Sequence, residues 1–338
     1  MATAAYPITN FTAGELSPLL EARVDLAQYA NGCKTLENFL VHPQGGIYRR
    51  GGTKYIASVK TAAKKTRLVP FEFSTTQAYM LEFGENYMRV YKDGGQIETG
   101  SPSAPVEITT TYAEAELFEL QFAQSADILY ITHYNHDPAQ LSRTSHTAWT
   151  LAASVFEDGP YLDENITDTT LTPSGTTGSI NITASAVTGI NGGTGFVAAD
   201  VGRLIRIGHI AAEWQQNHSY SVGNVVRNSD RVYECIRAGT SAGSGGPTTT
   251  GDSIADNTVT WKFVAEGGIQ YGYATVSSIT STTIVACAVQ KAFGGTSGET
   301  LWRLGAWYEG NYPRAVAFYE QRLMYAGSLY QPQTIWGS

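Results

Sequence analysis

Between residues 61 and 100, apolar and polar residues alternate in short runs, which is the period of half-buried β-strands. These runs cover 67–73, 78–83 and 87–91, and Ser-Thr-Thr and Gly-Glu-Asn separate them. Asp93-Gly94-Gly95 is a strong signal for a hairpin turn, because such turns need residues that tolerate positive φ angles. We therefore predict three or four short antiparallel strands, the size of one propeller blade.

The same layout returns twice, after a short helical pattern at 112–122. Strand patterns at 126–132, 139–143 and 148–151, and again at 315–319, 321–327 and 333–336, each enclose a loop that contains Pro. This weak internal repeat predicts propeller-like blades over 61–160 and a further, incomplete blade over 306–338. Because propellers close by pairing their ends, we expect a chain that stops at Ser338 to be truncated or incomplete.

The segment from 168 to 305 is rich in Thr, Ser, Gly and Val and carries almost no helical pattern. Alternating runs at 179–183, 202–207, 272–277 and 283–289 are typical of half-buried strands in a sandwich. A compositionally different segment interrupts them. We therefore predict a split β-sandwich-like domain, 165–212 and 267–305, around a small inserted β domain, 213–266.

The first sixty residues, 1–60, carry a different pattern, which predicts a helix followed by a hairpin. Apolar residues recur at spacings of three and four, as on one face of a helix: Leu26, Tyr29, Cys33, Leu36 and Phe39. Asp25 is placed to accept hydrogen bonds as the N-cap, although Gly32 weakens the pattern by roughly 1 kcal/mol relative to Ala. Pro43 ends the helix, and Gln44-Gly45-Gly46 predicts a tight turn between two short strands.

Composition agrees with a mainly β protein. Charged residues make up only 15% of the 338 residues, whereas Gly, Thr, Ser and Tyr are abundant. The net charge of −8 argues against sequence-independent binding of nucleic acid, which needs a basic surface. A mildly acidic wall does suit a conduit, because it repels phosphates and lets DNA pass without sticking.

The cysteines and the amino terminus indicate folding in a reducing cytoplasm. Cys33, Cys235 and Cys287 are far apart and form no CxxC motif, so we expect buried thiols. The first residues lack the basic and apolar regions of a signal peptide, and no apolar run approaches the length of a membrane span.

Aromatic residues are concentrated in the inserted segment. Trp214, Tyr220, Tyr233 and Trp261 stand beside short strand patterns in an arrangement similar to the small carbohydrate-binding modules of chitinases. Flat aromatic faces bind sugars by stacking on their C–H groups, so the resemblance implies that these four residues contact a glycan. The alternative is that a module of about fifty residues needs them as its core, and we expect at most two to be exposed.

Motifs for catalysis are weak, and we predict no enzyme and no cofactor. Gly239-Thr-Ser-Ala-Gly243 matches GxSxG, but Ser-Gly-Gly-Pro follows it instead of a helix. His133 and His136 are three residues apart beside Asp137, yet the sequence offers no further metal ligand for them. The carboxylates at 157–158 and 163–164 flank Gly-Pro-Tyr. A pair of carboxylates could serve glycoside hydrolysis, but acidic residues in such a turn are usually solvated, and we favour that interpretation.

Several motifs resemble the tail nozzle and hub proteins of short-tailed bacteriophages. The first sixty residues contain them in order: Asn-Phe-Thr-Ala-Gly-Glu-Leu-Ser-Pro (10–18), Arg-Val-Asp-Leu-Ala-Gln-Tyr (23–29), Gly-Cys-Lys-Thr-Leu-Glu-Asn-Phe (32–39) and Pro-Gln-Gly-Gly-Ile-Tyr-Arg-Arg-Gly-Gly-Thr (43–53). The blade patterns around 124–134 and 318–327 also resemble this family.

The resemblance implies a structural virion protein located in the phage tail and made in the host cytoplasm. It implies a homohexameric ring below the portal and adaptor that supports tail fibres or tail-tip proteins and lets genomic DNA leave. Arg49 and Arg50 are then either a solvated strand end or a contact to a neighbouring subunit or DNA. The alternative function is a surface-recognition protein that binds polysaccharide, such as a host surface glycan, through the inserted module.

Overall fold

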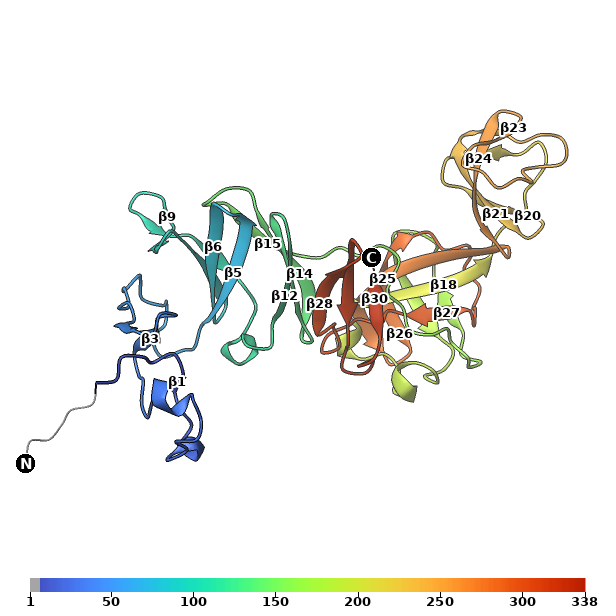
Figure 1. Cartoon of the computed structure of the whole chain (residues 1–338). Helices are drawn as coiled ribbons and strands as arrows, with labels where there is room; N and C mark the ends of the chain where they lie inside the picture. Colours follow the sequence, from blue (N-terminus) through green and yellow to red (C-terminus); the bar gives the residue numbers. More distant parts are fainter. Residues whose placement is uncertain (1–6, 338) are drawn as a thin grey trace, which may run out of the picture. The chain divides into compact units, whose positions relative to one another are not determined.

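A computed structural model describes residues 7–337, and the chain is mainly β, with 45% of residues in strands and 5% helical (Figure 1). Within the described residues, helical structure is limited to short 3-10 turns: η1 (Pro18–Leu20), η2 (Tyr29–Asn31), η3 (Glu114–Glu116), η4 (Asn191–Gly193) and η5 (Ala198–Asp200). The chain divides into two units, residues 1–57 and 58–338. The predicted mainly β class is therefore confirmed.

Over residues 7–57, the first unit contains two small sheets and no α-helix. Strand β1 (Gly14–Glu15) pairs in parallel with β2 (Gly32–Cys33), and β3 (Phe39–Val41) pairs antiparallel with β4 (Ile47–Arg49). The predicted hairpin is confirmed, and its turn has Gly45 at φ +99°.

The helix predicted over 26–39 is wrong. Gly32 is extended, at φ −122° and ψ 175°, and a Cβ there would lie 2.6 Å from Cγ of Leu16. Asp25 forms an ion pair with Arg23, with 2.7 Å between Oδ2 of Asp25 and Nη2 of Arg23. Asp25 therefore caps no helix. A single helix of this length is marginal unless another apolar surface covers it, and β1 is too short to do so.

The second unit begins with two antiparallel sheets that share one core. The first has the order β11-β7-β6-β5, with β8 beside β7, and the second has the order β12-β13-β14-β15. Their strands are β5 (Arg67–Ser74), β6 (Gln77–Gly84), β7 (Tyr87–Lys92), β8 (Gly95–Gln96), β11 (Glu107–Thr109), β12 (Gln121–Ser125), β13 (Ile128–His133), β14 (His136–Arg143) and β15 (Trp149–Ala153); β9 (Glu98–Thr99) and β10 (Ala104–Pro105) form a side hairpin. The rings of Phe71 and Trp149 meet edge-on across this core, with their centroids 4.9 Å apart.

A third small sheet packs beside the second one. It consists of β28 (Ala315–Tyr319), β29 (Arg322–Ala326) and β30 (Ile335–Gly337), close to the strands predicted there. Phe318 of β28 meets Tyr130 of β13 with ring centroids 5.6 Å apart. Of the helix predicted over 112–122, only the short turn η3 forms.

The centre of the second unit is one curled sheet of six strands rather than the two packed sheets of a sandwich. The order is β16-β17-β26-β25-β18-β27, with β16 (Leu171–Pro173), β17 (Ser179–Ala184), β18 (Leu204–Ile210), β25 (Ile269–Ser281), β26 (Ile284–Lys291) and β27 (Trp302–Leu304). Three register shifts along the β25–β26 ladder increase its twist, so the sheet curls into a half-barrel around its own core. An isolated bridge between Leu171 and Glu299 links the two edges.

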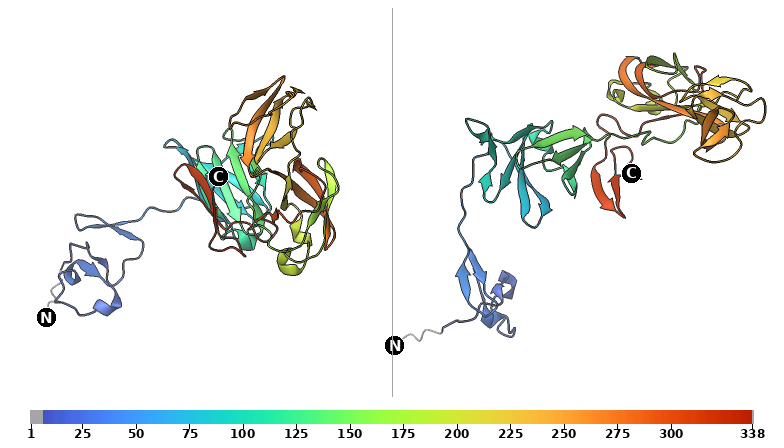
Figure 2. Two further views of the ribbon diagram at one scale, coloured as in Figure 1. Left: turned by 90° about the vertical axis from the view of Figure 1, so that its right-hand side faces the viewer. Right: turned by 90° about the horizontal axis from the view of Figure 1, so that it is seen from above.

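The inserted module leaves this sheet between β18 and β25 (Figure 1, with two further views in Figure 2). It contains a sheet of order β20-β21-β24-β23 and a pair β19-β22. The strands are β19 (Ser219–Tyr220), β20 (Val225–Asn228), β21 (Arg231–Arg237), β22 (Gly239–Thr240), β23 (Ile254–Asp256) and β24 (Val259–Glu266). The module has a separate small core made largely of aromatic side chains.

Candidate functional site

The aromatic residues predicted to bind sugar lie mainly inside the inserted module. Tyr233 and Trp261 are fully buried and Tyr220 is 7% exposed, so none of these three presents a ring face to solvent. Trp214 is half-buried and packs against the same core. The burial of Tyr220, Tyr233 and Trp261 favours the alternative interpretation, in which this small domain uses them as core residues because it has few other large apolar side chains.

Asp256 holds two of these aromatic residues in place. Its Oδ2 accepts hydrogen bonds from the indole N–H groups of Trp214, at 2.8 Å, and Trp261, at 2.9 Å. The backbone N–H of Ala242 donates to its Oδ1 at 2.9 Å. A buried carboxylate with several donors orders its surroundings, so Asp256 has a structural role in the module.

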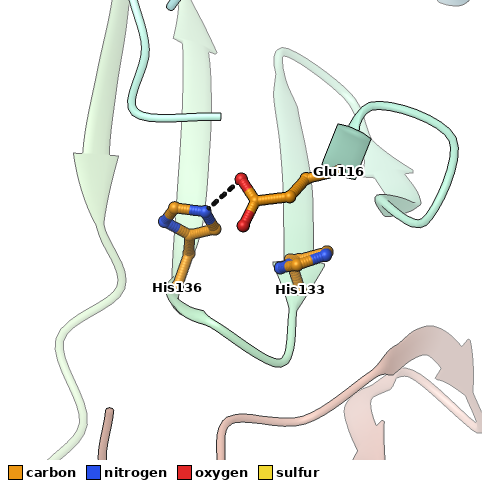
Figure 3. Close-up of side chains that lie close together, drawn as sticks. All are labelled: Glu116, His133 and His136. Atoms are coloured by element: carbon orange, nitrogen blue, oxygen red, sulfur yellow. Dashed lines mark hydrogen bonds and ion pairs between the residues drawn. The ribbon is translucent and has the colours of Figure 1, made fainter. Parts of the chain in front are cut away.

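A cluster with chemical potential lies instead at the hairpin between β13 and β14. His133 and His136 are direct partners across this hairpin, and only Tyr134 and Asn135 separate them. Cross-strand partners project to the same face of a sheet, and the two imidazole centroids lie 5.3 Å apart. Glu116 reaches both rings from η3 (Figure 3).

Hydrogen bonds orient the carboxylate of Glu116. Its Oε2 lies 2.8 Å from Nε2 of His136 and accepts the backbone N–H of Ala113 at 2.8 Å. The side-chain amide of Asn135 donates to its Oε1 at 3.2 Å. Burial by itself raises the pKa of Glu116, but these hydrogen bonds outweigh it and lower the pKa to about 2. The carboxylate is therefore ionised at neutral pH.

The two histidines have different surroundings. His133 is almost completely buried, which lowers the pKa of its imidazole below the ordinary value, although Glu119 opposes this with its Oε2 at 3.2 Å from Nε2. The backbone N–H of Asn135 donates to Nδ1 of His133 at 3.2 Å. His136 is about one-fifth exposed, and its Nδ1 lies 3.3 Å from Oγ1 of Thr111.

Two hollows open beside the cluster. One, of about 550 Å³, is lined by Thr111, Asn135 and His136 among others. The other, of about 390 Å³, is lined by Glu119, His133 and Arg314 among others. The hollows therefore border both histidines, but only His136, about one-fifth exposed, presents its imidazole to solvent.

The sequence indicates only part of this cluster. The spacing of His133 and His136 is visible, but Asp137, the acidic residue beside them, is not among the clustered ligands. Glu116 lies seventeen residues before His133 and was missed because it belongs to an isolated 3-10 turn. The only local signal for Glu116 is the helical pattern over 112–122, which a strand pattern follows.

Residues of the weak catalytic motifs take part in structural contacts. Ser241 of the GxSxG match is fully buried, and its hydroxyl donates to the backbone carbonyl of Gln215 at 2.6 Å. Of the carboxylates near Gly-Pro-Tyr, Asp158 accepts the hydroxyl of Tyr161 and Glu164 pairs with Arg303 at 3.2 Å. These side chains are occupied in structural contacts.

Outside this chain, comparison offers no guide to function: no protein-family model matches it and no curated protein is similar to it. Over residues 7–337, no helix has the length and apolar character needed to cross a bilayer.

Proposed function

We propose that this chain is a structural protein of a tailed-phage virion, a nozzle or hub component that assembles into a ring through which DNA leaves. The motifs of the first sixty residues support the family. One observation supports the assembly role: none of the hydrophobic side chains of residues 7–57 is buried.

This first unit exposes apolar residues that an independent domain would bury. Leu19 is 91% exposed, Val24 82% and Tyr55 75%. A fifty-residue segment without a core gains too little from burial to offset its lost conformational entropy. Its order therefore depends on surfaces outside this unit, and in a ring the neighbouring copy supplies them.

The unit also offers a receiving surface. A hollow of about 490 Å³ is lined by Leu16, Pro18, Leu20 and Tyr29, among others. Exposed apolar side chains on one copy and an apolar hollow on the next are the two complementary parts that a head-to-tail ring contact needs. The net charge of −8 is compatible with a channel that does not hold DNA.

Electron microscopy with class averaging of the purified chain, or of the particle that contains it, tests this proposal. A closed ring with a central channel supports it and gives the copy number, for which the family resemblance implies six. Leu19→Asp and Val24→Asp in the first unit are expected to abolish the ring. Ile166→Asp, at a residue 97% exposed in the second unit, is the matched control and should leave the ring intact.

Monomers of intact chain under all conditions, including the presence of portal and adaptor proteins, would overturn the proposal. The alternative function, polysaccharide binding by the inserted module, gains no support from aromatic residues that are mostly buried.

A further inference from the structure

We propose that Glu116, His133 and His136 bind one divalent transition-metal ion, with Zn²⁺ as its representative. One ligand atom from each of the three residues lies within 4.8 Å of the other two. Nothing in the proposed virion role requires such an ion, so this site is an additional property of the chain.

The distances suit a metal after small adjustments. Zn–N and Zn–O bonds of about 2.0–2.2 Å in a tetrahedral site place neighbouring ligand atoms roughly 3.3–3.6 Å apart. The cluster must therefore contract by no more than roughly 1.5 Å, which rotation of the Glu116 side chain and of the His136 ring provides. Glu116 lies in a short turn and His136 is the first residue of β14, beside the hairpin turn, so neither lies in the interior of a long regular element.

The donor set selects the class of ion. Two imidazoles and one carboxylate suit Zn²⁺ and neighbouring transition metals, whereas Ca²⁺ and Mg²⁺ prefer oxygen ligands throughout. Three protein ligands also leave a fourth position for water. The hollows beside His133 and His136 provide the space for that water.

Thr111 completes the arrangement around His136. Metal binding at Nε2 requires the tautomer with its proton on Nδ1, and Oγ1 of Thr111, 3.3 Å from Nδ1, accepts the hydrogen bond of that N–H. Such a partner on the remote nitrogen is typical of metal-binding histidines and orients the ring. Without metal, Nε2 of His136 forms a hydrogen bond directly with the carboxylate of Glu116.

Binding would connect two segments that are distant in sequence. Glu116 belongs to η3, which precedes the second sheet, whereas both histidines belong to the hairpin of that sheet. An ion shared by them would hold η3 against the β13–β14 hairpin. The expected consequence is a higher melting temperature of the chain in Zn²⁺ than in chelator.

Titration of the full, tag-free, chelator-treated chain with ZnCl₂ by calorimetry tests the proposal, and Co²⁺ absorption reports the coordination geometry. We expect one ion per chain and a four-coordinate Co²⁺ spectrum. Glu116→Gln and His136→Asn should each weaken binding at least tenfold, and Thr111→Val, which alters only the partner of Nδ1, by roughly tenfold.

Controls separate loss of ligand from loss of fold. Glu116→Gln keeps an acceptor for the Ala113 N–H, so its metal-free circular dichroism and melting temperature should stay close to those of the parent. His218→Asn removes a histidine of the inserted module and should leave binding unchanged. Absence of stoichiometric binding by the parent chain, or equal affinity in the parent, Glu116→Gln and His136→Asn, would overturn the proposal.

Discussion

Asp200 and Arg203 form an ion pair inside the second unit, with Nη1 of Arg203 2.7 Å from Oδ1 of Asp200 and both side chains 2% exposed. The guanidinium also donates to the backbone carbonyl of Gly305 at 2.7 Å and to Oδ1 of Asn191 at 2.6 Å. It lies over the ring of Tyr308, 4.3 Å from the centroid. One buried cation thus joins η4, η5 and the residues that follow β27.

Replacing Arg203 should therefore be severe. Arg203→Met leaves the carboxylate of Asp200 buried without its counter-ion, and we expect a loss of about 3–5 kcal/mol in the free energy of unfolding. Arg303→Met removes a half-exposed pair from the same sheet and should cost about 0–1 kcal/mol. Urea unfolding followed by tryptophan fluorescence measures both, and equal losses would contradict the assigned role of the buried pair.

Glu82 makes the first sheet sensitive to alkali. This buried carboxylate accepts the hydroxyls of Tyr87, at 2.5 Å, and Tyr91. Burial, followed by the hydrogen bond to Glu82, raises the pKa of Tyr87 to about 12 and also raises the pKa of Tyr91.

Since the folded-state pKa of Tyr87 exceeds the unfolded value of about 10, its stabilising contribution is complete below pH 10 and is lost as the pH rises toward 12. We expect circular dichroism and tyrosinate absorbance to change together in that window. Tyr87→Phe should cost about 1–3 kcal/mol at neutral pH, because Glu82 loses a donor. Tyr319→Phe, at a residue 66% exposed, is the control. It should change neither the pH window of the alkaline transition nor the stability at neutral pH.

Trp261 should control the stability of the inserted module alone. Trp261→Ala removes the largest side chain of a small core and frees Asp256 from one of its donors, so we expect a loss of about 3–5 kcal/mol within 213–266. Hydrogen exchange should show rapid exchange in β20–β24 and unchanged protection in β17 and β26. Val264→Ala, on an exposed position of the same strand, should leave exchange in the module as it was.

Gly195 and Gly192 form a matched pair for backbone strain. Both have positive φ angles, +80° and +67°, but a Cβ on Gly195 would lie 2.4 Å from the carbonyl oxygen of Thr282, whereas Gly192 has open space. Gly192→Ala should cost about 1–2 kcal/mol from the left-handed conformation. Gly195→Ala should cost about 2–5 kcal/mol, because the clash adds to the same strain. Thermal unfolding of both variants measures the difference.

Local sequence patterns predicted the strands well. β5, β6 and β7 coincide with alternating runs, and the turn at Asp93 and Gly94 has the positive φ angles, 52° and 73°, that its composition indicates. Side-chain alternation reports which residues of a strand are half-buried, so it locates strands without knowledge of their partners.

Features that depend on distant residues were not predictable in the same way. The apolar spacing of Leu26 to Phe39 suggested a helix, but Gly32 pairs instead with Gly14 and packs against Leu16. Glu116 meets His133 and His136 only because η3 packs against a hairpin formed later in the chain. The burial of Trp261 likewise follows from the small size of the module's core, whereas local sequence is compatible with either a sugar contact or a core position for this residue.

The inserted module begins and ends at two facing residues. Ile210 and Ile269 are register partners at the end of the β18–β25 ladder, and Ala211 donates to the carbonyl of Gly268 just beyond them. Any polypeptide whose ends lie one strand spacing apart can occupy this position without disturbing the curled sheet. The junction therefore meets the geometric requirement for inserting, removing or exchanging an outer module without changing the paths of β18 and β25.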